Sequence, residues 1–309
     1  MNGYERMPQA AGQAAGRADH AVKSGGAPKI CHVDLHDLGF SLGEGEGGGR
    51  PGLARNFPHE FAETVNRAAA LGFSHINVGP LFRLGEGDAS HLIADHRQAP
   101  PDIADGRSLE AVLGDLRATC ERQGLVLLVD LVLDRMALAG ASATSLGGAY
   151  GQPNPLNPLD PRVNRADLAV ARLQEGGVER AAHWWAALAE ELAAGGAGGF
   201  RLIGLDGLPS GAVGPLVGAI CRAVEGKSCW AWTPGLAWSR YPELRDTGIA
   251  GVFASACWWD GRSPWYVEEY RALHGLAPIL GVAGDTNLQR RDPQARASSS
   301  FERNRRDLM

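Results

Sequence analysis

The sequence predicts an α/β protein whose parallel sheet curves into a (β/α)8 TIM-barrel-like fold. Short apolar runs alternate with amphipathic stretches, which indicates strands alternating with helices. Residues 125–129 are apolar at every position, as expected of a parallel strand covered on both faces. The first apolar run is not followed by a glycine-rich phosphate turn, which favours a barrel over an open doubly wound sheet.

Seven apolar runs are predicted as strands and four amphipathic stretches as helices. The strands are expected at residues 30–38, 73–78, 125–133, 200–205, 229–232, 251–256 and 278–283. The helices are expected at residues 58–71, 108–123, 178–194 and 210–224, where apolar residues recur every three or four positions. The sequence predicts no eighth strand, so the barrel is incomplete at that position or the chain is a fragment.

The chain is predicted to hold one domain between two irregular segments. Residues 1–28 are rich in Gly, Ala and Gln without periodicity, which predicts a disordered leader. Residues 29–289 are expected to form the barrel. Residues 290–309 are polar, charged and aperiodic, which predicts a disordered or truncated tail.

Composition excludes several classes of protein. A net charge of -5 and a pI near 6.0 leave no basic surface for nucleic acid. No apolar run approaches the ~20 residues that span a bilayer, and the N-terminus lacks the apolar core of a signal peptide. The cysteines show no Cys-x-x-Cys pair, so we expect small buried thiols in a reducing compartment, the cytoplasm. They are Cys31, Cys120, Cys221, Cys229 and Cys257.

Neither a metal nor an organic cofactor is predicted. His32 and His36 are spaced as in a helical zinc motif, but they fall on a predicted strand and no Glu lies between them. A barrel carries its chemistry at the carboxyl ends of its strands. Polar residues follow five of the predicted strands, at residues 77–80, 130–135, 201–206, 230–234 and 284–286.

Five segments at or near these ends carry a family resemblance. Residues 71–80 read Leu-Gly-Phe-Ser-His-Ile-Asn-Val-Gly-Pro, and residues 95–97 read Asp-His-Arg. Residues 123–135 are an apolar strand that ends in Asp-Leu-Val-Leu-Asp-Arg. Residues 197–203 read Ala-Gly-Gly-Phe-Arg-Leu-Ile, and residues 283–286 read Ala-Gly-Asp-Thr. In this order the segments resemble the alpha-amylase family of glycoside hydrolases and transglycosylases. They are most similar to the degenerate amylase-like module that precedes the maltosyltransferase domain in some bacterial α-glucan proteins.

The chain departs from this family at the catalytic positions. In the family motif Gly-Phe-Arg-x-Asp the nucleophile stands two residues after the arginine, and here Ile203 follows Arg201 at that spacing. The family's catalytic Glu would fall within residues 228–234, which contain no carboxylate. Where the family has Asn-His after the third strand, this chain has Asp134 and Arg135. Where the family has a histidine before Asp-Thr, this chain has Gly284.

Retaining glycosidases need two carboxyl groups about 5 Å apart, so the resemblance implies a catalytically inactive barrel, a pseudoenzyme. Asp206 and Asp134 are the nearby carboxylates that could act as relocated catalytic groups. Strand alternation directs Asp206 away from the face of Arg201 unless the strand has already become loop. The run Asp206-Gly-Leu-Pro-Ser also fits an ordinary turn.

Six residues are predicted to bind substrate: Asp130, Arg201, Asp285, His91, Trp230 and Trp232. The resemblance implies that His91 replaces a substrate-stacking tyrosine and that Asp285 holds sugar hydroxyls. Asp130 ends an apolar strand and needs a partner, for which Arg201 is the natural choice; a buried ion pair that only closes the barrel mouth is the alternative. The tryptophans either stack on sugar rings or pack in the core.

Three functions remain open from the sequence. The first is an inactive barrel that binds an α-glucan or maltooligosaccharide, or supports a linked or partner maltosyltransferase. The second is an active glycoside hydrolase or maltosyltransferase with relocated carboxylates. The third is an unrelated lyase or aldolase-type barrel, which is disfavoured because no lysine ends a predicted strand.

Overall fold

A computed structural model of the chain describes residues 27–35, 57–85, 92–152, 169–256, 259 and 261–282. Its centre is one seven-stranded sheet in which every neighbouring pair is parallel. The strands follow one another in chain order: β1 (Ile30–Asp34), β2 (His75–Gly79), β5 (Val126–Val132), β9 (Gly199–Ile203), β10 (Ser228–Trp232), β11 (Gly251–Ala254) and β12 (Ile279–Gly281). All seven predicted strands are confirmed.

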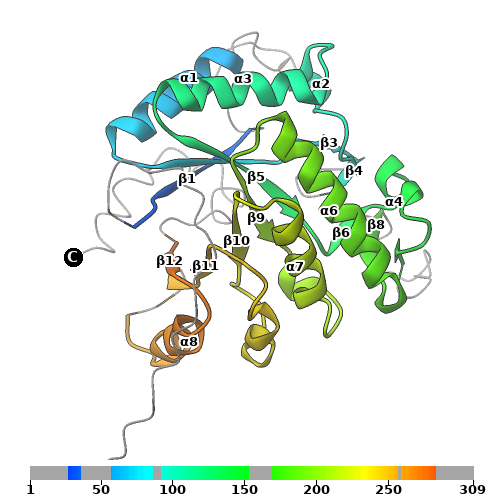
Figure 1. Cartoon of the computed structure of the whole chain (residues 1–309), viewed down its shortest axis with the longest axis vertical. Coiled ribbons are helices and arrows are strands. Elements are labelled where there is room, and N and C mark those ends of the chain that lie inside the picture. The colour runs from blue at the N-terminus through cyan, green and yellow to red at the C-terminus, as the bar shows by residue number, and fades with distance from the viewer. Residues whose placement is uncertain are drawn as a thin grey trace, which may run out of the picture.

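Helices return the chain from the end of one strand to the start of the next and cover the outer face of the sheet (Figure 1). They are α1 (Phe57–Ala70), α3 (Leu109–Arg122), α6 (Val178–Gly195), α7 (Val213–Ala223) and α8 (Trp265–His274). The 3-10 helix η3 (Trp238–Leu244) makes the connection from β10 to β11. The four predicted helices are confirmed to within three residues at each end.

Two excursions beyond the strand ends were not predicted. After β2 the chain forms a short antiparallel pair, β3 (Arg83–Leu84) with β4 (Ile93–Asp95), and then α2 (Pro101–Ala104). After β5 it forms a small three-stranded sheet and one short helix. These elements are β6 (Arg135–Ala137), α4 (Ala141–Ser145), β7 (Tyr150–Gly151) and β8 (Val170–Leu173). Strands of two to four residues are too short to show a periodicity in the sequence.

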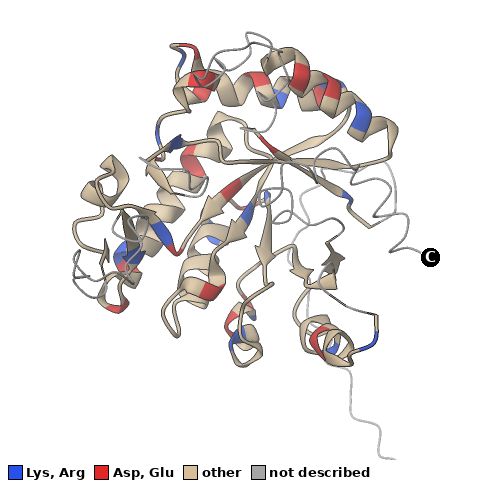
Figure 2. Cartoon of the chain, turned by 180° about the vertical axis from the view of Figure 1, so that it is seen from behind, with Lys and Arg blue, Asp and Glu red and all other residues tan. Residues whose placement is uncertain are grey.

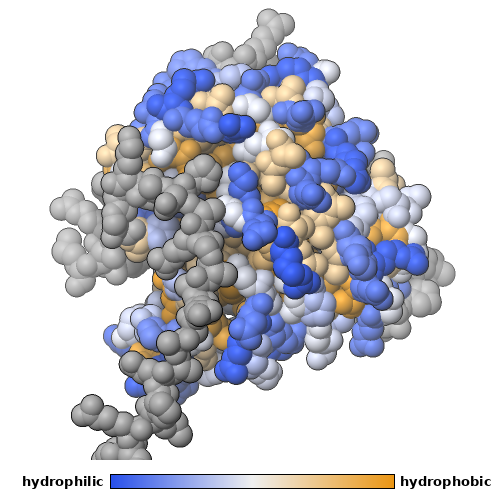
Figure 3. Space-filling view, in the orientation of Figure 1, coloured by the Kyte–Doolittle hydropathy of each residue, from blue (hydrophilic) through white to orange (hydrophobic). Residues whose placement is uncertain are grey.

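Each central strand alternates between two cores. Outward side chains pack with the helices in one large apolar cluster. Inward side chains form a second cluster around Leu128, Trp230 and Phe253, which come from three different strands. Such two-sided burial requires nearly continuous apolar strands. It explains why the helices and loops carry most of the charged residues (Figure 2) and why the surface over the helices is largely hydrophilic (Figure 3).

The sheet is an open half-barrel within the described residues, because β1 and β12 are its two edges and do not pair with each other. An incomplete (β/α)8 barrel is therefore the observed architecture. No helix in the described part of the chain is long and apolar enough to cross a membrane.

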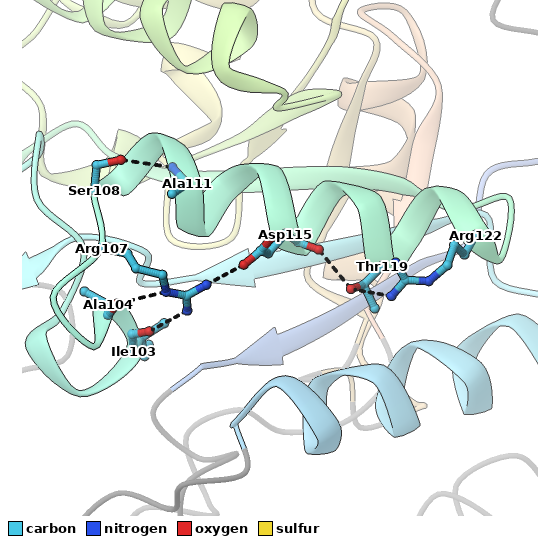
Figure 4. Close-up of polar contacts among 8 residues, drawn as sticks. All are labelled: Ile103, Ala104, Arg107, Ser108, Ala111, Asp115, Thr119 and Arg122. Carbon is cyan, nitrogen blue, oxygen red and sulfur yellow. Dashed lines mark hydrogen bonds and ion pairs between the residues drawn. The ribbon is translucent and has the colours of Figure 1, made fainter.

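Helix α3 shows how local sequence sets an element boundary (Figure 4). The hydroxyl of Ser108 accepts a hydrogen bond from the backbone N–H of Ala111 at 3.2 Å and caps the helix. Arg107, just before the cap, pairs with Asp115 inside the helix and donates to the carbonyl of Ala104. These contacts tie the first turns of α3 to the preceding loop.

Replacing Ser108→Ala should lower the free energy of unfolding by about 1 kcal/mol, because a helix N–H loses its acceptor. Urea unfolding measures the loss. Ser108→Asn is the matched control, since asparagine caps as well as serine. Equal losses in the two variants would show that the cap does not stabilise α3.

Candidate functional site

Polar side chains from four adjacent strands meet inside the barrel near the carboxyl ends of those strands. His32 of β1, Asn77 of β2, Asp130 of β5 and Arg201 of β9 occupy inward-facing positions. The strand register sets His32 beside Asn77 and Asp130 beside Arg201. This group is called the mouth cluster below.

A bidentate ion pair forms the centre of the mouth cluster. The Arg201 guanidinium donates from Nε to Asp130 Oδ1 at 2.7 Å and from Nη2 to Asp130 Oδ2 at 2.6 Å. Asp130 is 3% exposed and Arg201 8% exposed. Two parallel hydrogen bonds hold both side chains more firmly than one would, and burial keeps water from competing for these groups.

Asn77 and His32 complete the hydrogen-bond network. Asn77, which is fully buried, donates from Nδ2 to Asp130 Oδ1 at 2.8 Å and lies 2.9 Å from His32 Nδ1. Arg201 Nη2 lies 3.3 Å from the same His32 nitrogen. Both neighbours of Nδ1 are donors, and Arg201 Nη2 also lies 3.5 Å from His32 Nε2. Burial and the Arg201 charge lower the pKa of His32 to about 4, so its ring is neutral at neutral pH.

Gly79 makes room for this arrangement. A Cβ atom at position 79 would lie 2.2 Å from Asp130 Oδ2, so any side chain there would displace the carboxylate. Sequence reasoning placed polar residues at this strand end but did not assign roles to His32, Asn77 or Gly79. A polar residue and a glycine within an otherwise apolar strand are the signals that could have singled out the last two.

The charge state of Asp130 follows from its partners. Burial raises the pKa of its carboxyl, but the Arg201 charge and the hydrogen bonds from Arg201 and Asn77 outweigh burial. The pKa of Asp130 therefore lies below its ordinary value, and the carboxylate stays ionised at neutral pH.

An apolar residue and an aromatic ring border the ion pair. Ile203, two residues beyond Arg201 on the same face of β9, is half-buried at the strand's carboxyl end. The half-buried ring of Trp232, which ends β10, lies 5.3 Å from the Arg201 guanidinium and 5.5 Å from the Phe253 ring. The Arg201–Trp232 contact is a cation–π interaction.

Trp230 lies in the inner apolar cluster of the barrel. Its ring is 5% exposed, belongs to the inner apolar cluster and meets His75 edge-on at 6.2 Å. This placement matches the core-packing alternative for Trp230, whereas Trp232 is the tryptophan at the strand end.

The two carboxylates considered as substitutes lie in different surroundings. Asp134 is fully buried against the backbone of Gly204 and Gly207, and its Oδ2 lies 2.7 Å from Arg135 Nε. Burial raises the pKa of Asp134 despite this arginine. Asp206 is exposed within the 3-10 turn η2 (Leu205–Gly207) that follows β9, which confirms the predicted turn.

Two further predicted site residues, His91 and Asp285, lie outside the described residues. Among the residues that are described, no three His, Cys, Asp or Glu side chains gather as metal ligands. The structure shows that Asp130, Arg201 and Trp232 lie together. Their sugar-binding roles stay predictions.

Comparison with known proteins places this geometry in context. No protein-family model matches the chain. Over 226 residues it is 28% identical to the alpha-1,4-glucan:maltose-1-phosphate maltosyltransferase of Burkholderia pseudomallei (strain K96243). The match covers 72% of this chain and 20% of that protein, so the chain spans about a fifth of the relative's length.

Solved structures agree on the fold. An alpha-amylase from Malbranchea cinnamomea superimposes with a TM-score of 0.55 at 14% identity, covering 81% of this chain and 58% of that one. The alpha-glucosyl transfer enzyme XgtA gives a TM-score of 0.55 at 13% identity, covering 82% and 59%. The chain has an amylase-like barrel fold. The module thus spans a little over half the length of these solved enzymes.

The buried ion pair yields a stability prediction. Asp130→Asn leaves the Arg201 charge buried without a counter-ion, which should cost about 3–5 kcal/mol of unfolding free energy. The double variant Asp130→Leu/Arg201→Met removes both charges and should lose less than Asp130→Asn alone. Urea unfolding measures both, and a double variant less stable than the single one would contradict the uncompensated-charge explanation.

The same pair predicts a pH dependence. The pKa of Asp130 is lower in the folded chain than in the unfolded chain, so its stabilising contribution is present above the unfolded pKa of about 4. The contribution is lost as the pH falls through the folded pKa. The unfolding free energies of wild type and Asp130→Asn should therefore differ constantly from about pH 7 to 5 and converge below about pH 4. A constant difference down to pH 3 would count against an ionised Asp130.

Proposed function

We propose that this amylase-like module binds an α-glucan at its barrel mouth without cleaving it, in support of a linked or partner maltosyltransferase. One observation carries the proposal: the Asp130–Arg201 ion pair is intact, while the position that it faces at the end of β9 holds Ile203. The cluster that would position a reacting group is present without the reacting group.

The missing groups disfavour glycosidase chemistry. A retaining glycosidase needs a carboxylate that attacks the anomeric carbon and a carboxylic acid that protonates the leaving oxygen. The isoleucine side chain of Ile203 has no lone pair or acidic proton. Strand β10 ends at Trp232 and is followed by Thr233 and Pro234, so no acid stands at the second position either.

The groups that remain suit a sugar. Exposed His32 is neutral, and a neutral imidazole has one N–H and one acceptor nitrogen that can bond to sugar hydroxyls. The half-buried surfaces of Ile203 and Trp232 are apolar and can lie against the C–H face of a pyranose ring. Asp130 and Arg201, which lie deeper in the barrel, are already paired and buried, so their positions should not change when a ligand binds. A preorganised surface loses little entropy when a ligand binds.

The relatives supply the class of ligand. The curated relative is named for transferring a maltosyl group to an α-1,4-glucan, and the solved enzymes are named for α-glucan and glucosyl chemistry. We take an α-1,4-linked maltooligosaccharide as the ligand of this module. Four of its cysteines are free thiols, which fits the cytoplasm, where bacterial α-glucan would be met.

Titration of the chain with maltoheptaose should quench or shift its tryptophan fluorescence, because Trp232 would be covered. Isothermal titration calorimetry gives the dissociation constant. Trp232→Ala should weaken binding about tenfold, equivalent to about 1.4 kcal/mol. A reducing-sugar assay on the same mixture should detect no hydrolysis.

Trp184→Phe is the matched control, because Trp184 lies on α6 outside the barrel interior and should not alter binding. Circular dichroism of each variant separates lost binding from lost folding. Absence of any maltoheptaose binding to the folded wild type would contradict the binding proposal.

A second function, catalysis by relocated carboxylates, is favoured only by the exposure of Asp206 at the end of β9. Asp134, the other carboxylate considered, is buried and ion-paired, so it does not serve as an accessible second carboxylate for Asp206. If the chain did release sugar from an α-glucan, Asp206→Asn should abolish the release and the surface variant Asp115→Asn should not. That result would replace the binding proposal with an active glycosidase.

A further inference from the structure

Aromatic rings follow one another along α8, the last helix that the structure describes (Figure 1). Trp259 lies in the loop before the helix, and Tyr266, Tyr270 and His274 lie within it. The three helical residues are four positions apart, so they share one side of α8 on successive turns. The ring centroids of Trp259 and Tyr266 are 5.2 Å apart, and those of Tyr270 and His274 are 5.6 Å apart. These four residues are called the α8 stripe below.

Exposure sets the α8 stripe apart from the rest of the surface. Trp259 is 39% exposed and Tyr270 is 45% exposed, and His274 is exposed as well. Six large hydrophobic side chains are exposed in the described part of the chain, and three of them fall within residues 259–270. Exposed apolar surface is unfavourable in water, so its concentration in one short segment indicates a binding surface.

The Trp259 indole is held in a fixed orientation. Its Nε1 donates to the Ser263 carbonyl at 2.7 Å, and its backbone N–H donates to the Ala256 carbonyl at 3.2 Å. The Tyr266 ring packs against the indole at an interplanar angle of 32°. Because the ring is already ordered, it loses little entropy when a ligand covers its exposed surface.

A buried carboxylate fixes the helix that carries the stripe. Glu269, on the buried side of α8, is 2% exposed. It accepts hydrogen bonds from the backbone N–H of Ser255 at 3.1 Å, from the Ser255 hydroxyl at 2.7 Å and from the Tyr241 hydroxyl at 3.2 Å. Ser255 directly follows β11, so these contacts tie α8 to the end of a central strand. The stripe therefore stands on a rigid element.

The α8 stripe ends at a pocket. A cavity of about 390 Å³ lies beside Tyr270 and His274 and is bounded by residues 275–279, the turn after α8 and the start of β12. Its volume is in the range of small-molecule sites. The pocket lies at the amino end of β12, whereas the mouth cluster lies near the carboxyl ends of the strands, so the two are separate sites.

The chemistry of the stripe suits a sugar chain. Trp, Tyr and His each combine a flat ring with a polar group, as the C–H faces and hydroxyls of a sugar require. A groove for a protein helix is instead apolar throughout, and Val267 is the one large aliphatic side chain exposed on α8. From Tyr266 to His274 the helix rises about 12 Å, which is longer than a single sugar ring.

We propose that the α8 stripe is a second carbohydrate site, on which a chain of pyranose sugars stacks by its C–H faces and places one ring in the pocket beside Tyr270 and His274. The choice of an α-glucan as its ligand rests on the proposed function. Two separate sites on one rigid domain raise the affinity for a long glucan, because binding at one site increases the effective concentration at the other.

The test is retardation of the folded chain in native gels that contain amylopectin, a polymeric α-glucan. Trp259→Ala and Tyr270→Ala should each weaken the apparent affinity at least about threefold, because each removes one stacking ring. Leu71→Ala, which removes an exposed apolar side chain just after α1, is the matched control and should leave retardation unchanged. Adding both stripe substitutions to Trp232→Ala should abolish the retardation that Trp232→Ala retains.

The two carbohydrate sites fail separately in this experiment. Losses in the stripe variants without a loss in Trp232→Ala would support the α8 stripe and contradict binding at the mouth. Full retardation of both stripe variants, or no retardation of the wild type, would overturn the stripe proposal. Circular dichroism confirms folding, and Tyr270→Ala places the best helix former at an exposed helical position.

Size-exclusion chromatography examines the other use of such a surface. The wild type and Tyr270→Ala should elute alike. A wild-type dimer that becomes monomeric in Tyr270→Ala would show that the α8 stripe joins two copies of the chain, and would overturn the carbohydrate site.

Discussion

The bidentate contact between Asp130 and Arg201 constrains the whole mouth of this barrel. Two opposite charges removed from water are tolerated only when they are paired and hydrogen-bonded. The register of β5 and β9 sets them side by side, Asn77 supplies a further hydrogen bond, and Gly79 leaves space for the carboxylate. Trp232 lies over the guanidinium that results. Each of these positions follows from the need to satisfy one buried carboxylate.

The ion pair places no demand on the side chain at position 203. Nε and Nη2 of Arg201 both donate to Asp130, so the ion pair is complete without a carboxylate at position 203. Among the described residues, the inner face at the ends of β9 and β10 carries a buried ion pair, bordered by the half-buried side chains of Ile203 and Trp232.

Much of this could be predicted from the sequence because the central strands are nearly continuously apolar and the helices are periodic. Asp130 and Arg201 could be predicted as partners because a charged residue at the end of an apolar strand needs an opposite charge beside it. The roles of His32 and Asn77 could not be predicted, because they depend on which strands become neighbours. Trp230 and Trp232 differ by two positions and share a face, so only packing shows that one is core and the other lies at the mouth.

The central claim is that the mouth holds an α-glucan that it does not cut. A crystal structure of the chain grown with maltoheptaose tests this most directly. The account predicts one uncleaved oligosaccharide with a glucose ring against Trp232 and Ile203 and a hydroxyl at the His32 ring, above an unchanged Asp130–Arg201 pair. A cleaved glucan, or an oligosaccharide bound elsewhere with the mouth empty, would contradict it.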